Sequence, residues 1–425
     1  MPGLASPAYR LLLGGAFVAN IGSWMQTTAQ GWLVLRLTDS AAALGVASFA
    51  GMAPTLLLSL YAGVLADRVD RRRLLLGVQA TVGVLALILA IITTAGVVVF
   101  WQIVLIAFLA GCAQALGIPA FQALVPMLVD RPAVGNAIAV NSAQFNLSRI
   151  IGPALAGLFV GTLGEAPSFW LNALAALVLV LVLRAIDVPS NALMSRAEAG
   201  LWSNLLDGLR YVRGQRVLTA LMALAAAPAF FILPYMALLP IFARDILAIG
   251  APGLGLLTGS IGIGALSGAV VVALRGAAGG DGRVLVIGLT SMAIATAAFA
   301  LSGLVWLSCL ALAALGAAQV AYYTSTNTLV QILAPARLRG RILSIYTLTA
   351  LGFLPLGSLV AGAVAARVGA PATLAGGAAV TVGALILIVA WCPPIRTLHL
   401  DPLVPASGQR VEPLKPSPSE LPQEG

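Results

Sequence analysis

The chain has 425 residues, of which 60% are hydrophobic and only 9% are charged, and its mean hydropathy is +1.03. A soluble globular domain carries about a quarter charged residues, so this chain lacks the polar side chains to cover a water-facing surface. The composition excludes a soluble protein and predicts an integral membrane protein.

Long apolar runs without alternation predict membrane helices, since a spanning helix needs roughly 20 mostly apolar residues and a barrel strand about ten alternating ones. In chain order the expected spans are residues 10–35, 41–66, 73–95, 99–128, 134–163, 168–187, 217–243, 252–275, 284–303, 305–333, 340–366 and 371–392. The expected fold is an all-α membrane protein with about twelve transmembrane helices, with each helix boundary uncertain by a few residues.

Lys and Arg residues gather on one side of this topology. With the N-terminus inside the cell, 19 of the 23 Lys and Arg residues fall on the cytoplasmic side, 3 fall on the opposite side, and Arg149 lies within a span. Because cytoplasmic loops carry the excess of these residues, both termini are expected in the cytoplasm. The same charges beside anionic lipid account for the net charge of +9, so no nucleic-acid partner is expected.

Cysteine, histidine and lysine are too few for several kinds of chemistry. The three cysteines are scattered in apolar segments, which predicts neither a disulfide framework nor a metal site. The only lysine, Lys415, lies near the C-terminus, so a phosphate-binding loop with its lysine is excluded. We therefore expect no cofactor and no ATP hydrolysis by that route.

An internal repeat divides the chain into two halves. Residues 111–135 align with residues 316–340 without a gap, at an offset of 205, and identical residues include Gln114 with Gln319. Two parallel repeats of six spans, with a ligand site near the midplane between them, describe a transporter whose halves rock against each other.

The repeat also sets the expected domains. We expect a six-helix bundle over 10–187, a cytoplasmic central loop over 188–216, a second bundle over 217–392 and a disordered cytoplasmic tail over 393–425. Within the central loop, residues 201–214 have the spacing of an amphipathic helix, which either lies in the membrane interface or packs on the protein as a linker.

The loop GVLADRVDRRRLL (63–75) resembles the signature loop of the major facilitator superfamily, except that Asp70 stands where that family usually has glycine. The stretches at 21–45, 148–157 and 207–214 add to the resemblance, which covers roughly residues 10–392. They look like the bacterial exporters that include the enterobactin and macrolide efflux carriers. The resemblance implies the major facilitator fold, efflux, and a location in the bacterial inner membrane.

The resemblance also implies a gating role for this loop. Gly63 would allow a close helix approach, and Asp67 would pair with Arg68 or Arg71 in one state of the transport cycle and separate from it in the other. The alternative is that the arginines only enforce the topology.

Arg149 lies in the stretch NLSRIIGPALAG (146–157), inside the fifth expected span. An ionisable group there costs about 2.5–3.5 kcal/mol on insertion scales, which makes it a functional hypothesis by default. Pro153 disturbs the helix one turn back, at residue 149, while Gly152 and Gly157 let it pack tightly or pivot, as in the G-P-x-x-x-G signature of exporters. The alternative is that Arg149 only bonds backbone carbonyls freed by Pro153.

Every Asp and Glu lies in an expected loop, at a span end or in the tail, so Arg149 has no obvious carboxylate partner within the membrane. Its cavity should therefore favour a neutral or anionic amphiphile over a cation. Proton coupling would need Asp67, Glu165 or a carboxylate of the substrate.

Other candidate cavity residues are polar or aromatic side chains about one turn apart within apolar spans. They are Asn20, Trp24, Thr27 and Thr28 in the first span, Gln114 and Gln122 in the fourth, and Gln319, Tyr322, Tyr323 and Thr326 in the tenth. Hydrogen bonds between helices would explain an isolated Gln or Asn equally well. Several aromatic rings at one cavity suit a bulky, flat or apolar ligand.

The sequence thus predicts a secondary active transporter, and not an enzyme. We expect it to export an amphipathic, drug- or siderophore-like molecule by alternating access, as a monomer in the lipid bilayer, by antiport with protons. Alternatives are an uptake symporter or a lysolipid carrier of the same fold. From other classes, an intramembrane enzyme lacks a catalytic group in the spans, and a sensor lacks a soluble output domain.

Overall fold

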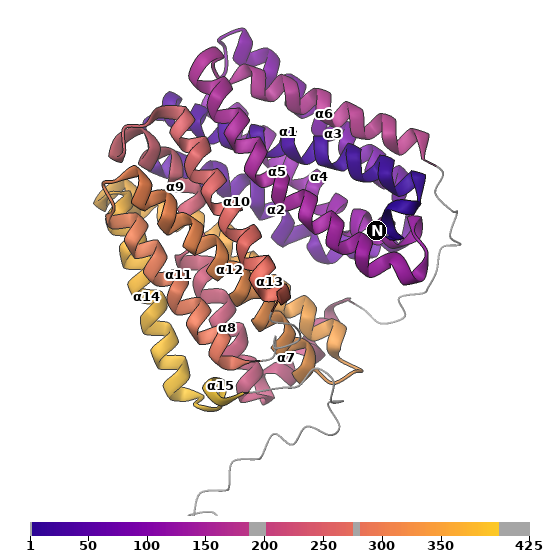
Figure 1. The fold of residues 1–425 in the computed structure, drawn as a ribbon, viewed down its shortest axis with the longest axis vertical. Coiled ribbons are helices and arrows are strands. Elements are labelled where there is room, and N and C mark those ends of the chain that lie inside the picture. Colours follow the sequence, from indigo (N-terminus) through magenta and orange to yellow (C-terminus); the bar gives the residue numbers. More distant parts are fainter. Residues whose placement is uncertain (1, 187–200, 275–280, 399–425) are drawn as a thin grey trace, which may run out of the picture.

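The computed structural model describes residues 2–186, 201–274 and 281–398, and Figure 1 draws the remainder as a grey trace. Within these ranges every regular element is a helix. Side chains are not described at residues 2–3, 59–64, 66–68, 201–205 and 397.

The first half of the chain forms a bundle of long helices, coloured indigo to magenta in Figure 1. They are α1 (Pro7–Thr38), α2 (Ala41–Arg68), α3 (Arg71–Thr94), α4 (Phe100–Leu124), α5 (Val134–Leu163) and α6 (Ala166–Ala185). Short 3-10 turns lie at Pro2–Ala5, Val125–Leu128 and Arg131–Ala133.

The second half forms another bundle, coloured from rose to yellow. It contains α8 (Arg216–Phe231), α9 (Tyr235–Ile241), the π-helical turn Phe242–Ile246, α10 (Gly250–Leu274), α11 (Gly282–Leu301), α12 (Val305–Leu333), α13 (Arg339–Val368), α14 (Ala370–Trp391) and the short α15 (Pro394–Thr397). The tail expected over 393–425 therefore includes a helical turn at its start, and residues 399–425 lie outside the described part.

Between the bundles, α7 (Leu201–Gly214) is the helix expected at 201–214. Its Asp207 carboxylate accepts a hydrogen bond of 2.9 Å from Arg341 on α13. A Cβ at Gly208 would lie 2.9 Å from the Ile345 side chain. This helix thus packs on the second bundle.

In the described residues, eleven helices are long and apolar enough to cross a membrane. This confirms a multi-pass helical membrane protein. Helix α1, expected as the first span, is not among the eleven, because its middle carries polar residues such as Asn20, Gln26 and Gln30. The span expected over 217–243 is interrupted after Phe231, where the chain turns before α9 begins.

Helix starts follow the sequence closely. Ser6 and Ser40 cap α1 and α2 by accepting hydrogen bonds from the amides of Tyr9 and Ala43. Asp70 caps α3 by accepting a hydrogen bond of 2.7 Å from the Arg73 amide. These side chains satisfy amides that a helix start leaves unpaired. Asp70 thus has a local structural role in the loop where the resembling family carries glycine.

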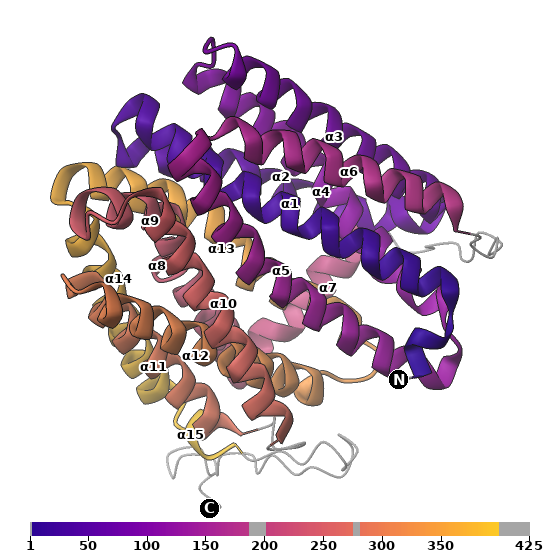
Figure 2. The same ribbon diagram turned by 45° about the horizontal axis from the view of Figure 1, so that its top comes forward.

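The two bundles meet along two helix pairs, α2 with α13 and α5 with α10 (Figures 1 and 2). Glycines bring the backbones together: a Cβ at Gly45 would lie 2.7 Å from the Ser358 carbonyl oxygen, and one at Gly157 would lie 2.7 Å from the Ala251 carbonyl oxygen. Small residues allow such close packing in membranes, where lipid provides no hydrophobic force to join helices.

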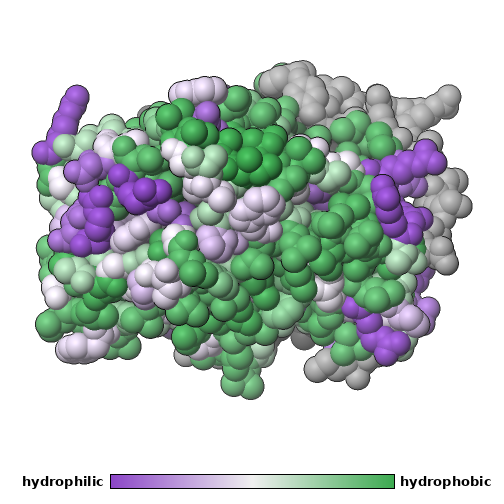
Figure 3. All heavy atoms as spheres, turned by 90° about the horizontal axis from the view of Figure 1, so that it is seen from above, coloured by the Kyte–Doolittle hydropathy of each residue, from purple (hydrophilic) through white to green (hydrophobic). Residues whose placement is uncertain are grey.

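Leu, Ile, Val and Trp side chains are exposed along the bundles, as at Leu274, Leu387 and Trp306, which are 82%, 72% and 65% exposed. Figure 3 shows hydrophobic side chains across the middle of one face and hydrophilic ones gathered toward its two ends. Such a surface suits hydrocarbon in the middle and water or lipid headgroups at the ends.

Candidate functional site

A cavity of about 410 Å³ lies between the two bundles. Its wall comes from α1, α2, α3, α4 and α6 of the first bundle and from residues 233–240, α10 and α13 of the second. Among the described residues that line it, none carries a charge, and the polar ones are Ser23, Gln26, Thr27, Thr28, Gln30, Ser48, Gln114, Asn172, Thr258 and Ser358. A mostly apolar wall with a few polar groups is typical of a site for a small molecule.

Trp24 links this cavity to Arg149. The indole lines the cavity, and the Arg149 guanidinium carbon lies 5.6 Å from the centre of its ring, in a cation–π contact. Gly152 makes this possible, because a Cβ there would lie 2.6 Å from the Trp24 Cβ. Phe145, one turn before Arg149, meets Trp24 edge to face at 6.1 Å and is 44% exposed.

The Arg149 guanidinium has no ion pair and no hydrogen bond to a backbone carbonyl within the described part of the chain. Its Nε is buried without a hydrogen-bond partner. The structure therefore gives no support to the alternative that Arg149 bonds carbonyls freed by Pro153. Tyr235 of α9 lies within electrostatic range of the guanidinium, yet its hydroxyl forms no hydrogen bond of good geometry.

Neighbouring tyrosines of α12 point in different directions. The Tyr322 hydroxyl donates a hydrogen bond of 2.6 Å to the Leu224 carbonyl oxygen, and Thr326 donates one of 2.8 Å to the Tyr322 carbonyl oxygen. Both side chains are fully buried within the second bundle. By contrast, the buried Tyr323 hydroxyl and Gln319 Oε1 have no partner. Tyr323 thus lies within electrostatic range of Tyr346 and Tyr235, whereas Tyr322 and Thr326 lie in the core of the second bundle.

Of the remaining candidate cavity residues, some line the cavity and others do not. Gln114, Thr27 and Thr28 line the cavity. Asn20 instead donates a hydrogen bond of 3.5 Å to Gln144 within the first bundle. Gln122 is exposed and does not line this cavity.

The signature loop is described only in part. The surroundings of Gly63 and the side chains of Asp67 and Arg68 lie outside the described part of the chain. Arg71 donates a hydrogen bond of 3.0 Å to the Met127 sulfur. Arg72, which the gating hypothesis did not include, donates hydrogen bonds of 2.6 Å to the carbonyl oxygens of Leu183 and Arg184 at the end of α6. A cation is favoured at that helix C-terminus.

The stretch around Pro153 packs in two directions. Gly152 faces α1 at Trp24, within the first bundle. Pro153 and Gly157 face α10, so that a Cβ at Gly157 would meet Ala251 and Pro252 of the second bundle. Helix α5 runs through Pro153 without interruption.

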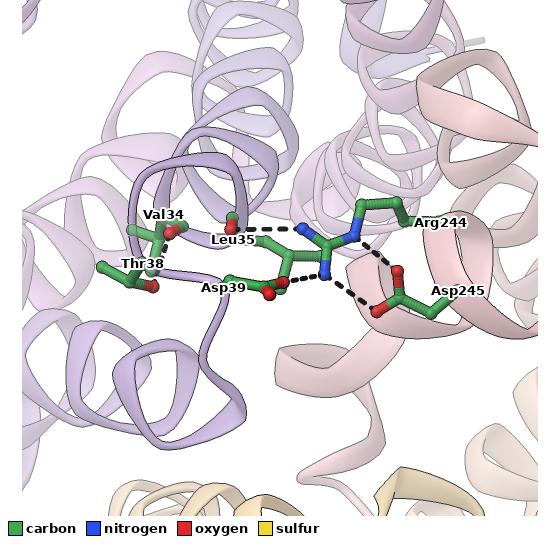
Figure 4. Close-up of polar contacts among 6 residues, drawn as sticks. All are labelled: Val34, Leu35, Thr38, Asp39, Arg244 and Asp245. Carbon is green, nitrogen blue, oxygen red and sulfur yellow. Dashed lines mark hydrogen bonds and ion pairs between the residues drawn. The ribbon is translucent and has the colours of Figure 1, made fainter.

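One end of the boundary between the bundles carries an ionic contact (Figure 4). Arg244 pairs with Asp39, which follows α1, and with Asp245, its own neighbour, at 2.6 Å. A further hydrogen bond of 3.4 Å joins Arg244 to the Leu35 carbonyl oxygen. We call Asp39, Arg244 and Asp245 the ionic latch, because they connect the two bundles.

Sequence reasoning missed four residues in the cavity wall and around Arg149 and Tyr323. Gln26 of α1 and Asn172 of α6 are joined by a hydrogen bond of 2.7 Å in the cavity wall. Asn172 is an isolated polar residue in an apolar run, and Gln26 lies between the candidates Trp24 and Thr27, so the signals that singled out Gln114 and Thr27 could have found them. Tyr235 and Tyr346 lie inside expected spans as Tyr323 does, so the signal that singled out Tyr323 could have found them too.

Comparison with known proteins agrees with this architecture. The profile of a family described as transmembrane secretion effectors matches residues 1–416. The chain belongs to the major facilitator superfamily. The family resemblance found in the sequence is thereby confirmed, and the protein is a membrane transporter of this superfamily.

Its relatives include efflux proteins. The multidrug efflux pump Tap of Mycobacterium tuberculosis is 29% identical, with 93% of this chain and 96% of that protein aligned. The staphyloferrin A transporter of Staphylococcus aureus is 29% identical over 41% of this chain and 44% of its own length. Macrolide efflux protein A of Streptococcus pyogenes is 22% identical over 49% of this chain and 52% of its own length.

Solved structures share the fold. The nucleoside transporter NupG matches with a TM-score of 0.74 at 14% identity, over 91% of this chain and 100% of that one. A bacterial homologue of the lysosomal transporter Spinster matches with a TM-score of 0.70 at 13% identity, over 92% of this chain and 98% of that one.

Proposed function

We propose that this protein is a secondary active transporter that exports an amphipathic small molecule, neutral or anionic, by alternating access. The observation that carries the proposal is the cavity between the bundles. Both bundles contribute to its wall, which includes Trp24, and the Trp24 ring contacts the Arg149 guanidinium. The full-length likeness to the multidrug efflux pump Tap supports export as the direction.

The proposed fold has twelve membrane helices in two parallel repeats of six. Helix bounds support it: α5 and α13 begin 205 residues apart, at 134 and 339, and end 205 residues apart, at 163 and 368. Helices α4 and α12 also begin 205 residues apart, at 100 and 305. In this scheme α1 is a polar spanning helix and α8 with α9 is one broken span. Polar and broken spans are tolerated where they line a cavity.

We place both termini in the cytoplasm of a bacterial cell, so that the ionic latch lies at the periplasmic or external end. The latch and the close contact of Gly45 with Gly362 join the bundles at that end. Phe145, beside Trp24, is 44% exposed, which fits a path to the cavity from the cytoplasmic side. These features support an inward-facing state. Export would then require the latch to open.

Protons are the proposed coupling ion, exchanged for the substrate. Glu165 is buried but forms a bidentate ion pair with Arg36, at 2.7 and 3.1 Å, which connects α1 to the start of α6 within the first bundle. A group engaged in this way is a poor proton carrier. Asp67 and a carboxylate of the substrate are the remaining candidates for the coupling.

The test compares accumulation of ethidium, erythromycin and a catecholate siderophore in efflux-deficient bacteria with and without the protein. We expect at least one compound to accumulate less when the protein is present, and a protonophore to abolish the difference. Inside-out vesicles give the direction, because an antiporter would lower a preset pH gradient when the compound is added. Equal accumulation of all compounds in both strains would refute export, and higher accumulation with the protein would indicate uptake.

A further inference from the structure

Four buried polar atoms of α5, α9 and α12 have no hydrogen-bond partner of good geometry. They are Nε of Arg149 on α5, the hydroxyl of Tyr235 on α9, and Oε1 of Gln319 and the hydroxyl of Tyr323 on α12. The other unpartnered buried side-chain atoms of the described chain are single Ser and Thr hydroxyls on α3, α6 and α12. Leaving such groups unpaired in a low-dielectric interior costs free energy, and a site that a ligand completes explains why they gather.

Contacts connect these residues into one cluster. Arg149 lies close enough to the Tyr235 hydroxyl for a weak hydrogen bond of poor geometry, and Tyr235 lies within electrostatic range of Tyr323. Tyr346 of α13 extends the cluster, since its hydroxyl donates a hydrogen bond of 3.4 Å to the Tyr323 carbonyl oxygen. Gln319 stands one turn before Tyr323 on α12, which places both on the same helix face.

The chemistry of the cluster is that of an anion receptor. A guanidinium and two phenol hydroxyls supply N–H and O–H donors, and a rotated Gln319 amide adds an NH₂. Hydrogen bonds from an ionised donor to an oxyanion are the strongest of this kind. No carboxylate of the described residues pairs with Arg149, so its positive charge is available to a ligand.

We propose that Arg149, Tyr235 and Tyr323 form a receptor for the single oxyanion group of the substrate, whose flat apolar body occupies the cavity on the other side of the contact with Trp24. The inference rests on the proposed transport function and narrows its substrate to amphipathic oxyanions, whether carboxylates or phosphate monoesters. The guanidinium comes from the first bundle and the hydroxyls from the second. An anion bound to both favours states in which the bundles are close at this point.

The experiment measures binding to the full chain in lipid nanodiscs, with matched charged and neutral probes. One arm compares 1-pyrenebutyrate with 1-pyrenebutyramide, and the other compares 1-naphthyl phosphate with 1-naphthol. Within each pair the aromatic body is constant, so the ratio of the two Kd values reports recognition of the oxyanion. We expect at least one acid to bind about tenfold more tightly than its neutral partner, as a charge-assisted contact predicts.

Three variants locate this preference. Arg149→Gln should reduce the ratio to about one, and Arg149→Lys should keep part of it. Tyr323→Phe should lower the ratio several-fold, because a donor is lost. Tyr322→Phe is the matched control: it removes a hydroxyl from the adjacent residue, which is bonded to Leu224, and should leave the ratio unchanged. Unfolding temperature and size-exclusion profile establish that each variant is folded.

The outcomes separate this inference from the proposed function. Equal binding of acid and neutral partner in both arms, or no binding of either acid, overturns the receptor even if efflux of a neutral compound is observed. A preference that persists in Arg149→Gln overturns it as well. If no compound is exported yet the acid preference depends on Arg149, the receptor stands and the export proposal fails.

Discussion

Asp39 and Arg244 form an ion pair across the two bundles although 205 residues separate them. The same offset aligns residues 111–135 with 316–340 and relates the bounds of α5 to those of α13. In a structure with two parallel repeats, equivalent positions can touch each other only near the axis that relates the repeats. In the proposed transporter with two repeats, the ionic latch therefore lies where opposite motions of the two bundles would separate its partners.

Breaking the latch should favour opening of its end of the molecule. Arg244→Gln removes the partner of both Asp39 and Asp245, and exposed pairs of this kind contribute up to about 1 kcal/mol, or roughly a fivefold change in the ratio of two states. In a variant without native cysteines, we expect a cysteine at Gln30 in the cavity wall to react several-fold faster with a membrane-impermeant maleimide added outside the cell.

Arg36→Gln is the control for the latch, because Arg36 pairs with Glu165 inside the first bundle. It should leave the maleimide rate at Gln30→Cys near that of the parent. A rate unaffected by Arg244→Gln, or raised equally by Arg36→Gln, would contradict a latch between the bundles.

Gly157 should tolerate no side chain. In Gly157→Leu the new side chain meets the Ala251 carbonyl oxygen and Pro252 of α10, so the bundles cannot keep their contact. Overpacking of this kind typically costs about 1–3 kcal/mol. We expect a lower unfolding temperature and loss of efflux, measured on purified protein and in cells. Gly135→Leu on the same helix has open space around its Cβ and should behave like the parent; similar losses in both variants would refute the steric explanation.

Gln26 and Asn172 should be energetically coupled. Replacing either by Leu leaves the other without its hydrogen bond of 2.7 Å, and an unsatisfied buried polar group costs about 1–3 kcal/mol. The double variant Gln26→Leu with Asn172→Leu should recover part of that loss. Thermal unfolding of the two single variants and the double variant measures the coupling free energy, and simple additivity would show that the bond contributes nothing.

Asp70 should matter for stability and not for gating. Asp70→Ala removes the cap of α3, for which a loss of about 0.5–2 kcal/mol is typical, and Asp70→Ser should restore most of it because serine is also a good cap. Efflux normalised to the amount of folded protein should stay close to that of the parent in both variants. A large transport defect in Asp70→Ser with normal stability would instead assign Asp70 to the transport cycle.

Much of the fold was predictable because the bilayer acts on local sequence. Apolar runs must form helices to pair their backbone groups in hydrocarbon, so composition predicted the spans. Capping residues such as Ser40 and Asp70 marked helix starts. The structure adds two local details: the span expected over 217–243 lies within the candidate span Arg216–Ile246 but turns after Phe231, and α1 forms over the expected residues but is more polar than the eleven candidate spans.

The candidate site was predictable only in part. Arg149 and Trp24 stood out as a charge and an aromatic residue in mid-span, and the structure places them in contact. Tyr322 and Tyr323 looked equivalent, yet one bonds within the bundle core and the other reaches the unpartnered cluster.

The sequence by itself determined that this protein is a multi-pass helical membrane protein and which superfamily it resembles, because these depend on the apolarity of runs of residues and on a local motif. Only the tertiary structure decided which side of each helix faces the other bundle. In a bilayer the lipid-facing and protein-facing sides are both apolar, so the pattern along a helix does not tell them apart. Successive residues of a helix are rotated by about 100°, so Tyr322 bonds within the bundle core while the neighbouring Tyr323 faces the candidate site. The meeting of Asp39 with Arg244 likewise depends on how the two bundles pack, which no local pattern contains.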